Sequence, residues 1–257
     1  MKRTALITGA SSGIGREFAK FHASRGGDLI VTARRAAALD SLKTEIEAAH
    51  PRTTVTTIAQ DLGSAQQAEA LYAATQGQQI DILINNAGFG GRGRFIDRPL
   101  EDDLAMIDLN INALVTLCHL IGADMAARGT GRILNVSSTA SYMPGPLQAT
   151  YFASKAFVSS FSQALDEELR ARGVTVTALE PGYVETEFAA RADLKGTPLT
   201  KSGANAADVA AFGYKAMEAG QLRAINDTRL RFALNWIFPL LPRRAILKQV
   251  RKMQTKS

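Results

Sequence analysis

The sequence is poor in the residues from which proteins build disulfide frameworks and metal sites. Among its 257 residues there are one cysteine, Cys118, and three scattered histidines, His22, His50 and His119. One cysteine excludes a disulfide framework and a cysteine-based zinc site. The histidines match no ligand spacing such as HExxH, so we predict that the protein holds no metal. A reduced, cytoplasmic setting is the natural expectation.

Long apolar runs are also absent. The longest, residues 232–241, reaches about half of a membrane span and contains Asn235 and Pro239. Residues 1–3 carry the charge of a signal peptide's start, but the apolar run behind them stops at Gly9. We therefore expect a soluble protein without a targeting segment.

Acidic residues are missing from the end of the chain. Residues 228–257 contain eight lysines and arginines and no aspartate or glutamate, whereas residues 1–227 contain 22 basic and 24 acidic residues. The formal net charge of +6 therefore belongs to a short tail on a mildly acidic body. No stretch interleaves aromatic and basic side chains as a nucleic-acid platform does, so we predict no nucleic-acid partner.

Short apolar bursts alternate with helical stretches. The bursts are rich in Ile, Val and Thr and lack clean alternation, which is typical of strands buried on both faces. This order predicts one α/β domain over residues 1–257, a doubly wound, Rossmann-type parallel sheet with helices on both faces and a less regular region at 185–205. The predicted strands are 4–8, 29–33, 55–59, 80–85, 133–137 and 174–179, with 222–226 as a candidate seventh. The predicted helices are 14–25, 36–49, 65–75, 101–128 and 151–172.

A glycine-rich turn follows the first predicted strand and opens the first helix. Glycines let the backbone bend sharply and approach a ligand without a Cβ in the way. The helix N-terminus then offers free N–H groups to a pyrophosphate. The spacing is GxxxGxG instead of the commoner GxGxxG dinucleotide fingerprint. We predict cofactor contacts at Gly9, Ser11, Ser12, Gly13, Ile14 and Gly15.

Two arginines, Arg34 and Arg35, follow the second predicted strand. An acidic residue at this point would hold the ribose 2′-OH of NAD, whereas arginine accommodates the 2′-phosphate of NADP. The alternative is that both are solvated residues at a helix start, but cations are unfavourable at a helix N-terminus. We predict NADP(H) as the cofactor.

Tyr151 and Lys155 lie four residues apart in a predicted helix, so their side chains share one face. A nearby ammonium favours the phenolate and is expected to lower the tyrosine pKa. Ser138 closes the fifth predicted strand, at the edge where doubly wound sheets bind their ligands, and can donate a hydrogen bond to a carbonyl oxygen. We predict catalytic roles for these three residues.

Together these residues resemble the short-chain dehydrogenase/reductase family, in its Tyr–Lys branch of about 250 residues. The resemblance extends from Thr4 to about Thr186 and is carried by motifs that match the family's own. They are Thr8-Gly9-x-x-x-Gly13-x-Gly15, Asp61-Leu62, Asn85-Asn86-Ala87-Gly88, Asn110, Ser138, Tyr151-x-x-x-Lys155 and Pro181-Gly182-Tyr183-Val184-Glu185-Thr186.

The resemblance implies hydride transfer between the cofactor and a carbonyl or secondary alcohol. Tyr151 would protonate the developing alkoxide, Ser138 would hydrogen-bond the same oxygen, Lys155 would lower the tyrosine pKa and hold the nicotinamide ribose, and Asn110 would place a relay water. It also implies a homodimer or homotetramer through helices 101–128 and 151–172. Further cofactor contacts are implied at Asp61, Leu62, Asn86, Ala87, Gly88, Pro181, Gly182, Val184 and Thr186.

The substrate is expected to be lipophilic, because apolar and aromatic residues surround these motifs. We expect the pocket to be lined by the loop 89–95, Tyr142, Met143, Leu147, Tyr183 and the region 185–205. Two other functions stay open. One is a 3-oxoacyl thioester reductase, in which Arg92 and Arg94 could meet a phosphopantetheine, although two solvated loop arginines are the favoured interpretation of this pair. The other is a dinucleotide-binding sensor or scaffold without turnover. The intact Asn110, Ser138, Tyr151 and Lys155 set argues against a sensor.

The C-terminal extension, residues 229–257, departs from the family pattern. Beyond Pro242, a helix with Ile246, Leu247, Val250 and Met253 on one face and cations around the rest is predicted. Such a helix can lie on an anionic membrane surface. The alternative is that this face packs on the protein's own body or on a sister subunit, and such packing is favoured over membrane binding because most apolar stripes belong to a core.

Overall fold

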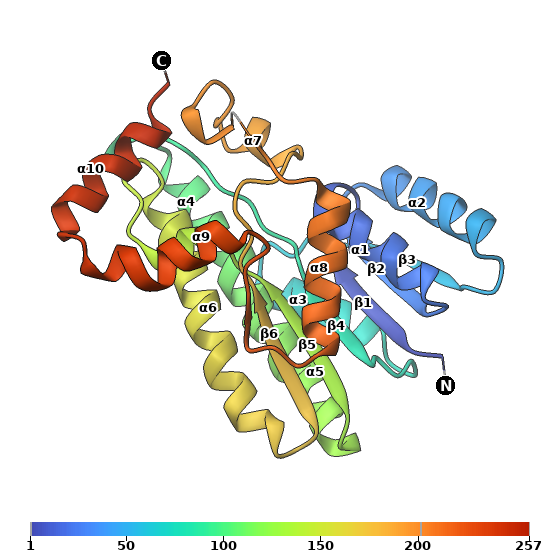
Figure 1. The fold of residues 1–257 in the computed structure, drawn as a ribbon. Helices are drawn as coiled ribbons and strands as arrows, with labels where there is room; N and C mark the ends of the chain where they lie inside the picture. Colours follow the sequence, from blue (N-terminus) through green and yellow to red (C-terminus); the bar gives the residue numbers. More distant parts are fainter. Residues whose placement is uncertain (1, 201, 257) are drawn as a thin grey trace.

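The computed structural model describes residues 2–200 and 202–256. Seven parallel strands form one sheet in the order β3-β2-β1-β4-β5-β6-β7 (Figure 1). The order reverses between β1 and β4, as in a doubly wound fold. The Rossmann-type prediction is confirmed. The strands are β1 Thr4–Thr8, β2 Asp28–Ala33, β3 Val55–Ala59, β4 Ile82–Asn85, β5 Gly131–Val136, β6 Val174–Leu179 and β7 Arg223–Ala224.

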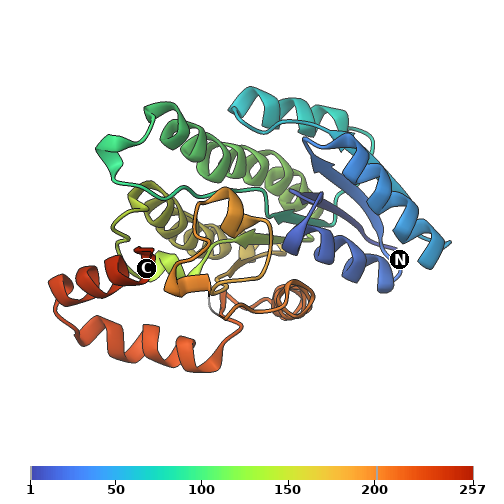
Figure 2. The same cartoon turned by 90° about the horizontal axis from the view of Figure 1, so that it is seen from above.

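Helices cover both faces of the sheet (Figure 2). One face packs against α1 Gly13–Ser24, α2 Ala36–Ala49 and α8 Ala206–Glu218, and the other against α3 Ala65–Ala74, α5 Ala113–Arg128 and α6 Ala149–Arg170. Burial on both faces explains why the strands read as continuous apolar runs. Helix α8 was not predicted from the sequence. Its Gly213 lets the helix approach Leu179 of β6 closely.

The predicted helix 101–128 is interrupted. It consists of α4 Leu100–Ile107, a π-helical turn at Asp108–Asn112 and α5. Within the described residues, the whole stretch Leu100–Arg128 is the one helix long and apolar enough to cross a membrane by length and composition. Its face towards the sheet, with Leu117, Ile121 and Met125, is buried in the core, as is usual for a core helix.

The chain ends in a helical hairpin beside the carboxyl edge of the sheet. It comprises α9 Thr228–Phe232, a π-helical turn Ala233–Ile237, a 3₁₀ turn Phe238–Leu240 and α10 Arg243–Gln254. Ile246, Val250 and Gln254 of α10 are buried, and the Gln148 side-chain amide donates to Gln254 Oε1 over 2.6 Å. The apolar face of α10 therefore packs on the protein's own body.

Candidate active site

A cavity of about 960 Å³ opens at the carboxyl edge of the strands. Of the predicted site residues, all but Gly15 and Asn110 line it. We call the side formed by the glycine turn, Arg34, Arg35, Asp61, Leu62 and residues 86–88 the cofactor wall. We call the apolar part of the lining the substrate wall, which is formed by Met143, Phe152, Tyr183, Phe188, Leu194, Pro198, Leu199, Leu230, Leu234, Phe238, Val250 and Met253.

The glycine turn is held against the end of β4. Asn86 donates from its side-chain amide to the Thr8 carbonyl over 3.0 Å, and Thr8 Oγ1 accepts from the backbone N–H groups of Asn86 and Ala87 over 3.0 and 2.9 Å. A Cβ on Gly9, whose φ is +67°, would lie 2.9 Å from Ala87 Cα. The turn therefore requires glycine there. Beyond it, α1 begins at Gly13 with free N–H groups facing the cavity.

Three arginines gather at the outer end of the cofactor wall. Arg35 is the N-cap of α2 and pairs with Glu187 over 2.9 Å. Arg191, which the sequence analysis missed, also lines the cavity. Burial lowers the Arg191 pKa, and the charges of Arg34 and Arg35 lower it further. Converging cations of this kind form a site for an anion such as phosphate.

Tyr151 and Lys155 lie one turn apart on α6 and both line the cavity. Burial raises the Tyr151 pKa to about 12, and the nearby Ser138 hydroxyl opposes this shift. Burial lowers the Lys155 pKa to about 8. The Lys155 ammonium lies 5.9 Å from the Tyr151 ring centroid, and burial is the main cause of the raised tyrosine pKa. The lowering of this pKa by Lys155 stays a prediction.

The other two predicted catalytic residues adjoin this pair. Ser138 lies two residues beyond the end of β5, and its hydroxyl caps a short 3₁₀ helix, Thr139–Tyr142, by accepting from Ala140 N over 3.1 Å. Asn110 sits in the π-helical turn, a form of helix that is frequent at functional sites. Its side chain bonds both backbone groups of Phe89 and the Ser154 hydroxyl. The Asn110 amide therefore positions the loop after β4.

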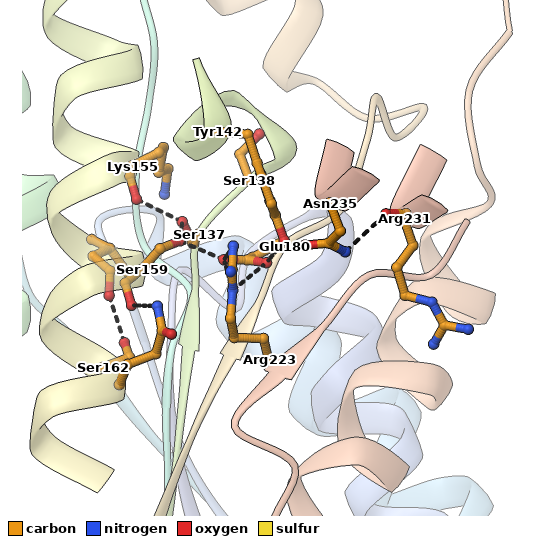
Figure 3. Close-up of polar contacts among 12 residues, drawn as sticks. Ser137, Ser138, Tyr142, Lys155, Ser159, Ser162, Glu180, Arg223, Arg231 and Asn235 are labelled. Carbon is orange, nitrogen blue, oxygen red and sulfur yellow. Dashed lines mark hydrogen bonds and ion pairs between the residues drawn. The ribbon is translucent and has the colours of Figure 1, made fainter. Parts of the chain in front are cut away.

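A buried carboxylate that was not predicted from the sequence, Glu180, lies in the same region as Ser138 and Lys155 (Figure 3). Glu180 is fully buried and accepts hydrogen bonds from Tyr142 over 2.8 Å, Ser159 over 2.7 Å and Arg223 over 3.1 Å. It therefore ties the segment after Ser138 to α6 and to β7. The sequence signal for this residue is an acidic side chain directly after an apolar strand. A carboxylate buried there requires hydrogen-bond partners from other elements.

The substrate wall differs in part from the prediction. Met143, Tyr183 and the region 185–205 contribute to it, but Tyr142, Leu147 and the loop 89–95 do not. Tyr142 instead turns towards Glu180. Arg92 donates to the Asp193 carboxylate over 2.6 Å, so its charge is already paired. The C-terminal segment supplies much of the wall in their place.

The fold and this cavity define a Rossmann-type protein with a site for a nicotinamide dinucleotide. The family model for short chain dehydrogenases matches residues 3–195, so the chain belongs to that family. A very-long-chain 3-oxoacyl-CoA reductase of Pyrenophora tritici-repentis is 36% identical over 187 residues, which are 71% of this chain. They are 55% of that protein, so the chain spans about half the length of this relative.

Two solved structures resemble the whole chain. The short-chain dehydrogenase from Sphingobium yanoikuyae in complex with NADPH is 29% identical, with a TM-score of 0.85 over 99% of both chains. The bulky-bulky ketone specific alcohol dehydrogenase from Comamonas testosteroni is 26% identical, with a TM-score of 0.81 over 98% of this chain and 96% of that one. The resemblance to these two therefore includes the C-terminal segment, which lies beyond the family model.

Proposed function

We propose that the protein reduces a lipophilic ketone to a secondary alcohol with NADPH. The observation that carries this proposal is the division of one cavity into two unlike walls. The cofactor wall carries three arginines, the substrate wall is apolar, and the Tyr151 ring lies 5.4 Å from that of Phe188 in the substrate wall, centroid to centroid. The cavity is large enough for a dinucleotide and a bulky apolar substrate.

The choice of NADPH rests on charge. Arg34, Arg35 and Arg191 line the same end of the cavity, and no acidic residue follows β2 in the place where NAD-binding proteins hold the ribose. The related Sphingobium yanoikuyae structure is described as an NADPH complex, which supports the same choice. The glycine turn and the N-terminus of α1 would hold the pyrophosphate, and Thr186 and Val184 would adjoin the nicotinamide.

The cofactor, when bound, supplies the hydride for the carbonyl carbon. Tyr151 is a neutral phenol at neutral pH, since its pKa is about 12, and it therefore holds the proton that the developing alkoxide oxygen needs. Ser138 donates a hydrogen bond to the same oxygen. Lys155, with a pKa of about 8, is mainly protonated at pH 7 and resupplies the proton that Tyr151 gives up. The apolar wall excludes water from the reacting carbon.

Replacement of Tyr151 by phenylalanine tests the proposal. We expect the turnover of ketones to fall by about 10³-fold, because the proton donor is lost, while the dissociation constant of NADPH in calorimetry stays within about threefold. The matched control is Tyr142→Phe, whose hydroxyl faces Glu180 and not the cavity. Near-normal turnover of Tyr151→Phe would contradict the assignment, and a clear preference for NADH would contradict the choice of cofactor.

A 3-oxoacyl thioester is the second candidate substrate, and the relative named as a very-long-chain 3-oxoacyl-CoA reductase favours it. A panel of ketones and 3-oxoacyl-CoA thioesters, followed by NADPH oxidation, separates the two. Preference for thioesters would replace the ketone as substrate and leave the roles of Tyr151 and Lys155 unchanged. Binding of NADPH without turnover of any substrate would instead favour a sensor or scaffold.

The protein is also proposed to form a homodimer or homotetramer. Only 39% of the apolar window of Leu100–Arg128 is buried within one chain, and Leu100 and Leu104 are exposed, which leaves apolar surface for a second copy. Sedimentation equilibrium, with Leu104→Asp as the disrupting variant, tests this. A monomeric wild type would contradict it.

A further inference from the structure

The segment from Thr228 to Leu240 is apolar on two opposite faces. Leu230, Leu234 and Phe238 recur every four residues and line the cavity. Phe232, Trp236 and Leu240 recur at the same spacing, two residues out of step, and their side chains are 60%, 69% and 84% exposed. A helix places positions two residues apart on opposite sides. One face of this wall therefore closes the cavity, and the other is left uncovered.

The uncovered side chains form one surface, which we call the outer surface. It consists of Phe232, Trp236, Ile237, Leu240 and Leu241, all exposed. The hairpin that carries it lies at one edge of the molecule (Figures 1 and 2). Exposed apolar clusters of this kind mark a docking site, and tryptophan is enriched where a protein meets the headgroup region of a bilayer.

The charges around the outer surface are of one sign. Eight lysines and arginines and no acidic residue occur in residues 228–257. All eight side chains are exposed. Lys256 pairs with Asp193, and the other seven have no ion-pair partner among residues 2–200 and 202–256. These seven are Arg229, Arg231, Arg243, Arg244, Lys248, Arg251 and Lys252.

We propose that the outer surface docks the protein on an anionic phospholipid bilayer, with the cations on the headgroups and Trp236 and Leu240 in the interface. A second copy of this chain does not fit, because a two-fold contact would set the same unpaired cations against each other. Nor does α10 insert its own apolar face, since Ile246 and Val250 are buried against the body. The docked hairpin would separate the bilayer from the cavity by a single helix.

Sedimentation with vesicles tests the docking. The wild-type protein is mixed with vesicles of phosphatidylcholine alone or of phosphatidylcholine with phosphatidylserine. We expect it to pellet only with the second kind, and less at high salt, because exposed charges are screened. Trp236→Asp/Leu240→Asp should weaken pelleting by at least about tenfold. The control is Leu222→Asp, which changes a leucine that is 41% exposed outside the hairpin.

The cations are tested separately. Arg243→Gln/Lys248→Gln/Arg251→Gln should weaken pelleting on the anionic vesicles by about tenfold or more. Arg25→Gln/Arg52→Gln/Lys215→Gln removes the same charge from exposed positions elsewhere and should not. NADPH binding, measured without vesicles, shows that each variant is folded.

Three results would overturn the proposal: a wild type that stays in solution with anionic vesicles, outer-surface variants that pellet like the wild type, or a change in molar mass caused by Trp236→Asp/Leu240→Asp without vesicles. The last would mean that the outer surface joins protein chains. Pelleting needs no turnover, so the docking and the proposed reaction fail independently.

Discussion

The two walls of the cavity are built in different ways. The cofactor wall consists of turns that follow β1, β2, β3 and β4, and the turns after β1 and β4 are joined by hydrogen bonds from the Asn86 and Ala87 N–H groups to the Thr8 hydroxyl. The substrate wall is assembled mainly from residues beyond β6. More than half of these residues lie outside the region 3–195 that the family model matches. The cofactor wall is thus common to the family, whereas the substrate wall is where this chain can differ from its relatives.

The first prediction addresses the cofactor wall, where the largest effect is expected. A Cβ on Gly15 would meet the Asn86 side-chain amide and the Gly9 carbonyl oxygen at distances that real atoms do not reach. Because one of these neighbours is backbone, Gly15→Ala must shift the turn, and we expect the NADPH dissociation constant to rise by about 100-fold. Calorimetric titration measures it.

Gly122→Ala is the matched control. It lies in α5, and its Cβ would have only ordinary contacts at 3.6 Å. NADPH binding should not change, and the added methyl group favours the helix. Normal binding by Gly15→Ala would show that the cofactor wall tolerates backbone shifts, and the contrast between the two walls would lose its basis.

The second prediction concerns the pH dependence of turnover. Lys155 loses its proton as the pH rises through about 8, while Tyr151, with a pKa of about 12, stays neutral. Ketone reduction needs protons on this pair, so its rate should fall by about tenfold per pH unit above pH 8. Alcohol oxidation needs the pair to take up a proton, and neutral Lys155 can accept it through Tyr151, so the oxidation rate should rise over the same range.

Full pH–rate profiles in both directions check this. Variants at the aliphatic and phenylalanine positions of the substrate wall should leave the midpoint unchanged, because these side chains do not titrate. Equal slopes in the two directions would mean that another group limits the rate.

The same contrast explains what the sequence could predict. The sequence brings most of the glycine turn, Arg34 and Arg35, and the Tyr151 and Lys155 pair to the cavity, because the placement of each depends on spacing within one turn or helix. Glu180 was missed because its hydrogen-bond partners are distant in the sequence: Arg223 is 43 residues away, and Ser159 lies on another element. The α10 helix was predicted from its periodicity, but periodicity does not say what its apolar face meets. Tyr142 was predicted to line the pocket because the sequence does not reveal that its hydroxyl donates to Glu180.

The third prediction addresses the substrate wall. Phe238 lines the cavity and packs partly buried beside Tyr151 and Phe152. Phe238→Ala removes apolar contact with a lipophilic substrate, so KM should rise by about tenfold, with NADPH binding unchanged. Steady-state kinetics at saturating NADPH measure it. Phe232→Ala, an exposed position on the opposite face of the same segment, is the control and should keep the wild-type KM in vesicle-free buffer. An equal loss of NADPH affinity in Phe238→Ala would show that the walls are coupled.

The smallest effect is expected where the walls meet. Glu187 lies just beyond Thr186 and pairs with Arg35 over 2.9 Å, and both side chains are more than half exposed. A 2′-phosphate would compete with this carboxylate for the same guanidinium. Glu187→Gln removes the competitor, so NADPH affinity should increase by about two- to fivefold, in keeping with the small free energy of exposed ion pairs, while NADH affinity stays the same. Titrations with both cofactors decide the point. If NADPH and NADH affinity changed together, Arg35 would be responding to the dinucleotide as a whole, and Arg34 and Arg191 alone would remain to distinguish the 2′-phosphate.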